Sequence, residues 1–286
     1  MDKVKISIGY SEDLIQKFLP KIRSLVEYLE LYLSPEQYYK TNIDFRKNFD
    51  AINLLFNFIS DKVDFLSRYK ENYKIIKEIN PDIITTSSYL FGEYLAKQGH
   101  RVETSIVNVI DHIGDVYELN RIGFTGYCLP PYKNYDFDFM RESKKFFPGM
   151  RIKLIANNFC GRCIRFAERH ETIYYGNSRG KIEKEIDSMI GCNLITNNTL
   201  KMSIVTPSML NKYNDVDIFK FATRRDRPEL FESVINFLEN KDTDYLRNLF
   251  TVAYRRQDVD EDVKKFINLK KLCLYECFKC NYCESK

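Results

Sequence analysis

Apolar and polar positions alternate along this chain with two periods, one typical of strands and one typical of helices. Short alternating or apolar runs predict strands at residues 4–8, 26–33, 82–87, 101–110, 124–130, 151–157, 201–205 and 216–222. Apolar residues at helical spacing predict helices at residues 11–23, 45–59, 63–79, 89–98, 112–122, 136–147, 182–190, 228–238 and 242–250. Several of these helices end at glycine, as helices commonly do.

Strand and helix follow each other most regularly from residue 81 onward. This alternation indicates parallel β/α winding, because a crossover helix is the usual connection between two parallel strands. Eight candidate strands favour a closed (β/α)8 TIM-like barrel over an open sheet, so the expected fold class is α/β. We expect a TIM-like barrel domain over residues 1–250 and a cysteine-rich C-terminal extension over residues 251–286 that packs on the barrel mouth.

Length and charge narrow the class of protein only a little. A chain of 286 residues with 44% hydrophobic composition can bury a substantial core. Its 44 basic and 40 acidic residues are too balanced to indicate a polyanionic partner by themselves. The sequence holds no apolar run long enough for a transmembrane helix, so we expect a soluble, cytoplasmic protein without a membrane partner.

Cysteine placement is the strongest chemical signal. The chain has 8 cysteines, which are too sparse for a disulfide scaffold, and most of them gather in short segments. Cys160 and Cys163 directly follow the predicted strand at 151–157, with Gly161 between them to let the backbone curl. Two thiolates at this spacing can bind one metal ion or cluster, but they supply only half a site.

The remaining ligands have to come from elsewhere in the chain. Cys192 lies alone in a short IGCN segment, and Cys277, Cys280 and Cys283 form a CxxCxxC array near the end. Two-residue gaps of this kind bring several sulfurs to one point in iron-sulfur and zinc sites. Cys273 is either a further ligand or a core residue, and Cys128, inside an apolar strand, is interpreted as packing.

The motif order along the chain resembles a known group of barrel proteins. The segments TSIVNVID, RIGF, CLPPYKNYDFDFMR, IKLIANNFCGRC and VDIFKFATRRDRP are similar, in this order, to TIM-barrel proteins related to the collagenase-like peptidases of unassigned mechanism. That group includes the iron-sulfur proteins of oxygen-independent ubiquinone hydroxylation and several RNA-modification factors. The resemblance covers residues 82–238. It implies a (β/α)8 barrel with a cysteine-held iron-sulfur cluster at its mouth, and it implies no single reaction.

The chain also departs from this group. It lacks the longer glycine-rich cysteine signature around Cys192, and its last three cysteines lie at the very end. Seven clustered sulfurs together with the resemblance favour a 4Fe-4S cluster, or two, over the alternative of zinc. A CxxxCxxC arrangement of Cys273, Cys277 and Cys280 matches the radical SAM spacing, but its terminal position argues against that assignment.

Polar residues near predicted strand ends are candidates for catalysis and substrate binding. His170, Glu103, Lys220 and Arg224 are the candidate catalytic residues, while Asn157, Asn158, Arg165 and Arg169 are candidate substrate contacts. Each has a structural alternative: His170 can pack in the core, and the arginines can form a solvated face. An inward charge in a barrel requires a partner, so Glu103 and Lys220 can equally form a structural ion pair.

These observations favour an iron-sulfur barrel enzyme that carries out a redox or radical-type modification, such as oxygen-independent hydroxylation, of a small molecule, peptide or RNA base. An electron-donor protein or a partner subunit would be its partner. One alternative is a non-catalytic metal-binding or electron-transfer accessory protein. Another is an RNA-modification factor, for which the basic stretch at 264–271 is suggestive. Proteolysis is not expected, because the chain has neither an HExxH motif nor a Ser/His/Asp arrangement.

Overall fold

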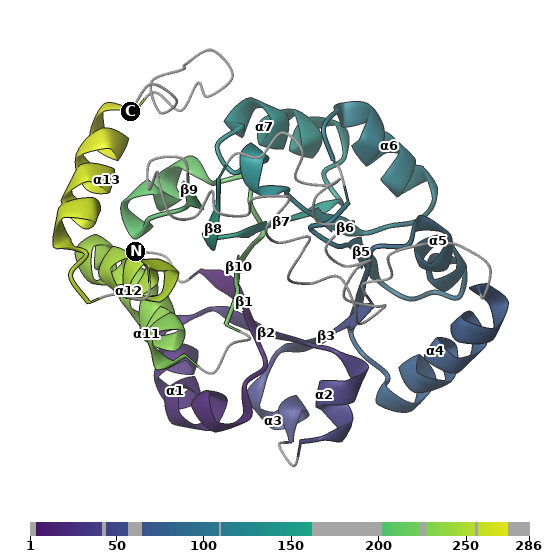
Figure 1. Ribbon diagram of the computed structural model, residues 1–286. Coiled ribbons are helices and arrows are strands. Elements are labelled where there is room, and N and C mark those ends of the chain that lie inside the picture. The colour runs from purple at the N-terminus through teal and green to yellow at the C-terminus, as the bar shows by residue number, and fades with distance from the viewer. Residues whose placement is uncertain are drawn as a thin grey trace, which may run out of the picture.

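Eight parallel strands form a closed barrel, with the outer faces of the strands packed on helices (Figure 1). The structure is a computed structural model that describes residues 4–41, 44–56, 65–108, 110–161, 202–223, 227–254 and 257–273. The barrel strands are β1 (Lys5–Gly9), β2 (Tyr28–Leu33), β3 (Ala51–Phe56), β4 (Ile83–Thr86), β5 (Val102–Thr104), β6 (Gly126–Cys128), β7 (Arg151–Ile155) and β10 (Ile218–Phe221). This confirms the predicted α/β class and the (β/α)8 TIM-like barrel.

Helices surround the barrel and connect its strands. Those in the described ranges are α1 (Glu12–Leu25), α2 (Pro35–Tyr39), α3 (Phe45–Asn48), α4 (Phe65–Ile79), α5 (Tyr89–Lys97), α6 (Ile113–Arg121), α7 (Phe137–Phe146), α11 (Pro228–Leu238), α12 (Asp242–Tyr254) and α13 (Asp260–Leu272). In the described part of the chain, two short 3-10 helices, η1 (Pro131–Lys133) and η3 (Pro207–Lys212), lie in loops. Within the described residues, none of the helices is both long and apolar enough to cross a membrane.

Local sequence signals set several helix ends. The Ser88 hydroxyl accepts a hydrogen bond from the Phe91 amide and caps α5, and the Asp136 carboxylate does the same for α7 from the Phe139 amide. Gly99 and Gly123, which follow α5 and α6, have φ angles of +85° and +93°. This left-handed conformation is the one in which helices often terminate and which glycine adopts without strain.

The segment at 45–59 differs from its prediction. Instead of one long helix, the chain forms the one-turn helix α3 and then strand β3. All six residues of β3 are buried, because one face lines the barrel and the other packs on helices. A strand buried on both faces loses the alternation that distinguishes it from a buried helix.

The predicted strand at 201–205 exists, but it is not part of the barrel. It is β9 (Met202–Ile204), which pairs antiparallel with β8 (Asn157–Gly161) to form a separate two-stranded sheet. The two strands leave the barrel between β7 and β10, at the carboxyl end of β7 (Figure 1). The expected total of eight barrel strands was therefore correct, although β3 replaces β9 among them.

The last two helices continue the packing of the barrel. The helix α12 runs across residue 250, and α13 contributes the buried side chains Val263 and Phe266 to the same hydrophobic core. The ring of Phe266 meets that of Phe250 edge-on, with centroids 5.8 Å apart. The chain after Cys273, which carries the predicted CxxCxxC array, lies outside the described residues.

Candidate functional site

The inside of the barrel is lined by polar and charged side chains. The carboxylate of Glu30, on β2, is fully buried and accepts hydrogen bonds from the Ser7 hydroxyl at 3.0 Å and the Asn53 amide at 2.8 Å. The Thr85 hydroxyl donates in turn to the Asn53 carbonyl oxygen at 2.9 Å. Interior layers of TIM barrels are dominated by branched apolar residues, so this connected polar layer across β1 to β4 is unusual.

Two cations from β7 complete the polar layer. The Lys153 ammonium lies 2.6 Å from Glu30 Oε1 and 2.5 Å from Glu103 Oε2. The Arg151 guanidinium contacts the same two carboxylates, at 3.2 Å from Glu30 and 2.8 Å from Glu103. Glu30, Glu103, Arg151 and Lys153 are named the interior ion network below. The network spans β2, β5 and β7 and contains two acids and two bases.

Burial and charge oppose each other at Glu30. Burial by itself raises the pKa of this carboxyl, but Lys153 and Arg151 outweigh it and lower the pKa from 4.5 to about 2. Glu30 is thus ionised at neutral pH. In Tyr28, at the start of the same strand, burial is the main cause that raises the pKa to about 12, and Glu30 adds to the effect.

Lys220 and Tyr32 lie at the carboxyl ends of two barrel strands, where active sites of TIM barrels are built. The Lys220 ammonium is 4.0 Å from the centroid of the Tyr32 ring, which is a cation–π contact. The Tyr32 hydroxyl donates to the Phe221 carbonyl oxygen at 2.7 Å, which fixes the ring. Lys220 is half-buried, so its charge remains within reach of a molecule at the mouth.

Asn157 fastens the end of β7 to the end of β10. Its side-chain oxygen accepts a hydrogen bond from the Ala222 amide at 2.7 Å, and its amide nitrogen lies 3.4 Å from the Ala222 carbonyl oxygen. A similar double contact joins β10 to β1. There the Thr223 hydroxyl accepts from the Gly9 amide at 2.8 Å and donates to the Gly9 carbonyl at 3.0 Å. The carboxyl ends of β7, β10 and β1 therefore form one fixed rim.

Cys128 also belongs to the barrel interior. Its thiol is 3% exposed, and burial is the largest of the effects that raise its pKa to about 11. Lys220, Lys153, Glu103 and Glu30 all act on this pKa, so the thiol faces the same interior as the ion network. A thiol in this environment stays protonated and unreactive, in keeping with a packing role.

The predicted site residues fall into two groups. Glu103, Lys220, Asn157, Asn158 and Cys273 lie within the described part of the chain, as does the backbone of Cys160 on β8. Outside it lie His170, Arg224, Arg165, Arg169, Cys163, Cys192, Cys277, Cys280 and Cys283. Among the described residues, no group of three or more His, Cys, Asp or Glu side chains could hold a metal ion.

The structure gives Glu103 different partners from the one considered in the sequence. It pairs with Arg151 and Lys153 rather than with Lys220. Glu30, Arg151 and Lys153 were not singled out from the sequence, although Glu30 alternates with Leu29 and Leu31 in β2. The available signal was an acidic residue that alternates with apolar residues in a predicted strand, because alternate residues of a barrel strand face the interior.

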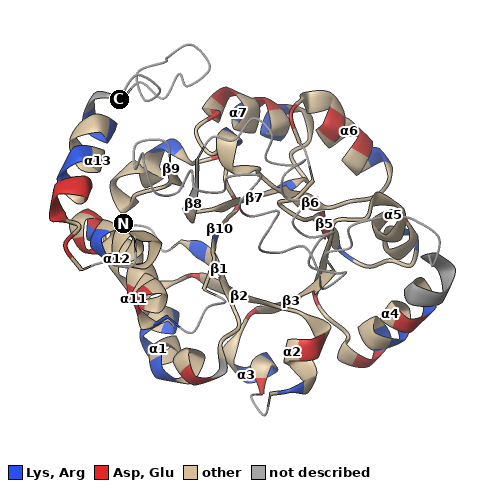
Figure 2. Ribbon diagram, viewed as in Figure 1, with Lys and Arg blue, Asp and Glu red and all other residues tan. Residues whose placement is uncertain are grey.

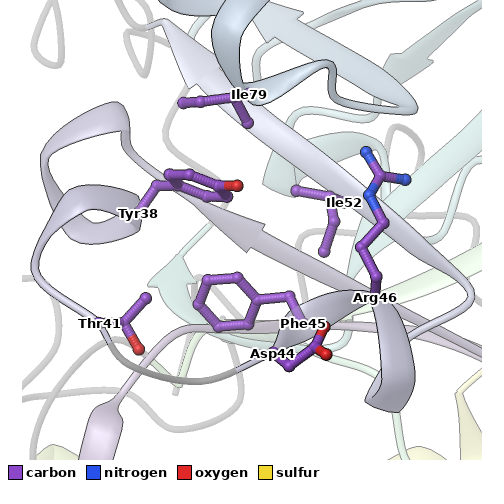
Figure 3. Close-up of a pocket in the computed structure, with 7 residues that line it drawn as sticks. All are labelled: Tyr38, Thr41, Asp44, Phe45, Arg46, Ile52 and Ile79. Carbon is purple, nitrogen blue, oxygen red and sulfur yellow. The ribbon is translucent and has the colours of Figure 1, made fainter.

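A small pocket lies outside the barrel, where α2 and α3 connect β2 to β3. It has a volume of about 190 Å³ and is lined by Tyr38, Thr41, Asp44, Phe45, Arg46, Ile52 and Ile79 (Figure 3). Its charged residues already have partners, since Arg46 binds Asp82 at 3.1 Å and Asp44 binds Lys47 at 3.1 Å. Figure 3 shows the polar groups of Tyr38, Thr41, Asp44 and Arg46 beside rings and aliphatic side chains, so the lining of this pocket is polar and apolar in similar measure.

Comparison with known proteins places the chain by fold alone. The structure of a U32 peptidase, Mk0906, matches with a TM-score of 0.56 and 8% sequence identity, over 77% of this chain and 93% of that chain. This likeness supports a fold shared with the collagenase-like peptidases. A putative fructose-1,6-biphosphate aldolase from Coccidioides immitis matches with a TM-score of 0.44 and 10% identity, over 85% of this chain and 92% of that chain. No family model and no curated protein matches the sequence.

Proposed function

We propose that this protein is an iron-sulfur enzyme of the TIM-barrel class that carries out a redox or radical-type modification, such as oxygen-independent hydroxylation. A small molecule, a peptide or an RNA base would be the substrate. The observation that carries the proposal is the position of Cys160. It lies on β8, which starts at Asn157 where β7 ends, so a candidate cluster ligand is on a strand that leaves the barrel mouth.

The donor set fits such a cluster chemically. Thiolates are the usual ligands of iron-sulfur clusters, and a CxxC pair with a CxxCxxC array supplies more than the four that one cluster requires. At the other end of the chain, α13 packs on the barrel and ends just before Cys273, which is half-buried against the core. A bound cluster would supply electrons at the mouth, and zinc remains the alternative metal.

The chain's own residues would bind and orient the substrate. The Lys220 ammonium, held over the Tyr32 ring, would attract a negatively charged group of the substrate to the mouth. Asn157 holds the ends of β7 and β10 in register, which keeps Lys220 and β8 at a fixed separation. Preorganised charge of this kind favours both binding and reaction because it costs no rearrangement when the substrate arrives.

Of the two roles considered for Glu103, catalysis and a structural ion pair, we infer the structural one. Its carboxylate is 1% exposed and is paired with both cations of the interior ion network. A general base needs to reach the proton that it removes, and both oxygens of this buried carboxylate already face cations of the network. His170 and Arg224 stay candidates for acid–base and substrate contacts at the mouth.

The test is metal analysis of anaerobically purified protein. We expect iron and acid-labile sulfide together with a visible charge-transfer absorption, all of which Cys160→Ser should reduce strongly. The matched control is Cys128→Ser, which removes a thiol that is buried in the barrel interior and should leave bound iron unchanged. Zinc without iron, or equal iron in wild type and Cys160→Ser, would contradict the proposal.

The RNA-modification alternative has less support from the surface. Within the basic stretch of α13, Lys264 pairs with Glu261 at 2.9 Å and Lys270 is buried. Figure 2 shows basic and acidic residues together on this helix. RNA binding that weakens steeply as salt rises would nevertheless favour this alternative, because phosphate contacts release counterions.

The peptidase activity in the name of the structural neighbour Mk0906 does not carry over to this chain. That peptidase shares the fold with this chain at 8% sequence identity, and a fold alone does not define an activity. We propose that this chain is not a protease. Peptide hydrolysis that persists after metal removal and disappears on a single substitution would contradict this.

A further inference from the structure

Tyr135 connects the loop after β6 to the two-stranded β8–β9 sheet. Its side chain is 4% exposed, and its hydroxyl donates to the Ile204 carbonyl oxygen and lies 3.4 Å from that of Met202. The neighbouring Asn134 amide donates to the Ser203 carbonyl at 2.8 Å and to the Ile155 carbonyl at 3.0 Å. Two adjacent side chains thus hold every residue of β9 by its backbone.

The ring of Tyr135 also makes a cation–π contact with a lysine of the C-terminal helix α13. The ammonium of Lys270, on α13, lies 3.9 Å from the centroid of the Tyr135 ring and 5.2 Å from that of Phe266. Lys270 is only 7% exposed. Burying an ammonium group is costly unless something compensates it, and the two aromatic rings contribute to that compensation here.

These contacts form a continuous path from α13 to β8. Lys270 touches Tyr135, Tyr135 binds Ile204 of β9, and Ile204 pairs with Asn157 of β8. Cys160 is on β8, while the helix that carries Lys270 ends at Leu272. The helix that ends just before Cys273 and the two-stranded sheet that contains Cys160 are therefore anchored on one tyrosine.

We propose that Lys270 is a positioning residue that couples the C-terminal helix α13 to the two-stranded β8–β9 sheet through Tyr135. The contact holds the end of α13 close to the β8–β9 sheet. Its bearing on the thiol ligands rests on the proposed function: α13, which ends just before Cys273, and β8, which carries Cys160, are held in a fixed relation. The coupling itself concerns the protein without metal.

The test is amide hydrogen exchange on the full-length, metal-free chain. Lys270→Ala should speed exchange in α13 and also in β9, by roughly tenfold, since it removes a desolvated cation–π contact. Lys271→Ala, which removes the exposed neighbour, should change neither. Tyr135→Phe should speed exchange in β9 while α13 stays protected, because the ring remains and only the hydroxyl is lost.

Lys270→Met provides a variant that keeps the side-chain volume if the alanine variant fails to fold. It should reproduce the loss of protection in β9. Faster exchange confined to α13 in Lys270→Ala or Lys270→Met, with β9 unchanged, would overturn the proposed coupling. Because no metal is present in this experiment, its failure is distinguishable from a failure to bind iron, which the purified holoprotein reports independently.

Discussion

Glu30 and Glu103 share one ammonium group although they stand on β2 and β5, separated by two other strands of the barrel. Lys153 lies 2.6 Å from the first and 2.5 Å from the second. Two like charges buried in one barrel would repel each other, so their stability depends on the cations of β7. This relationship makes the interior ion network sensitive to the loss of either cation.

Lys153→Met should therefore destabilise the protein by about 3–5 kcal/mol, because it leaves two buried carboxylates with Arg151 alone. Urea unfolding monitored by circular dichroism measures the effect. The control is Lys97→Met, which removes an exposed lysine from its pair with Glu93 and should cost at most about 1 kcal/mol. Equal effects of the two substitutions would show that the network contributes no more than a surface pair.

Stability should also fall in acid through Glu30. Its pKa is lowered from 4.5 to about 2 on folding, since Lys153 and Arg151 outweigh the effect of burial. The stabilisation is complete above the unfolded pKa and is lost as the pH falls from 4.5 towards 2. Glu30→Gln should have a flatter dependence of unfolding free energy on pH over this window. An unchanged slope would contradict the assignment.

Gly126→Ala should disturb β6 and β7. A Cβ atom at this position would lie 2.8 Å from the Arg151 carbonyl oxygen and 2.9 Å from Arg151 Cβ, and the first of these belongs to the backbone. We expect a loss of about 1–3 kcal/mol in unfolding free energy, as in other overpacked cores. Gly114→Ala, in α6 with nothing within 4 Å, should be neutral or stabilising.

Cys128 should resist alkylation in the native protein. Burial raises the pKa of its thiol to about 11, so very little thiolate is present at neutral pH. Iodoacetamide labelling followed by mass spectrometry should find Cys128 unmodified until the protein unfolds. Cys273 is partly exposed and provides an internal comparison in the same digest. Rapid native labelling of Cys128 would show that the barrel interior opens.

Sequence patterns predicted the barrel because most of its units contain local signals. Gly99 and Gly123 mark helix ends, and Ser88 and Asp136 mark helix starts. Strand β3 lacked such a signal, since its six buried residues form an apolar run that also suits a helix. The pattern predicted β9 as a strand, but its antiparallel pairing with β8 could not be inferred from local sequence.

The candidate site was harder to predict because its contacts join distant residues. The need for a partner to Glu103 was evident from the sequence, yet Arg151 and Lys153 reach it only through the register of β5, β6 and β7. The pair of Glu30 with Lys153 spans 123 positions in the chain. Neither composition nor periodicity determines which inward charges meet across a barrel.

The interior ion network also bears on whether this barrel could arise from, or be divided into, two halves. A half built from β1 to β4 would enclose Glu30 without either of its cations, which both stand on β7. The other half would hold those two cations with Glu103 as their single network carboxylate. Each half would carry one unbalanced charge, which would make packing its inner face away from water costly until the other half supplies the opposite charge. Charge neutrality is thus a property of the complete ring, and it ties the two halves to a common folding event.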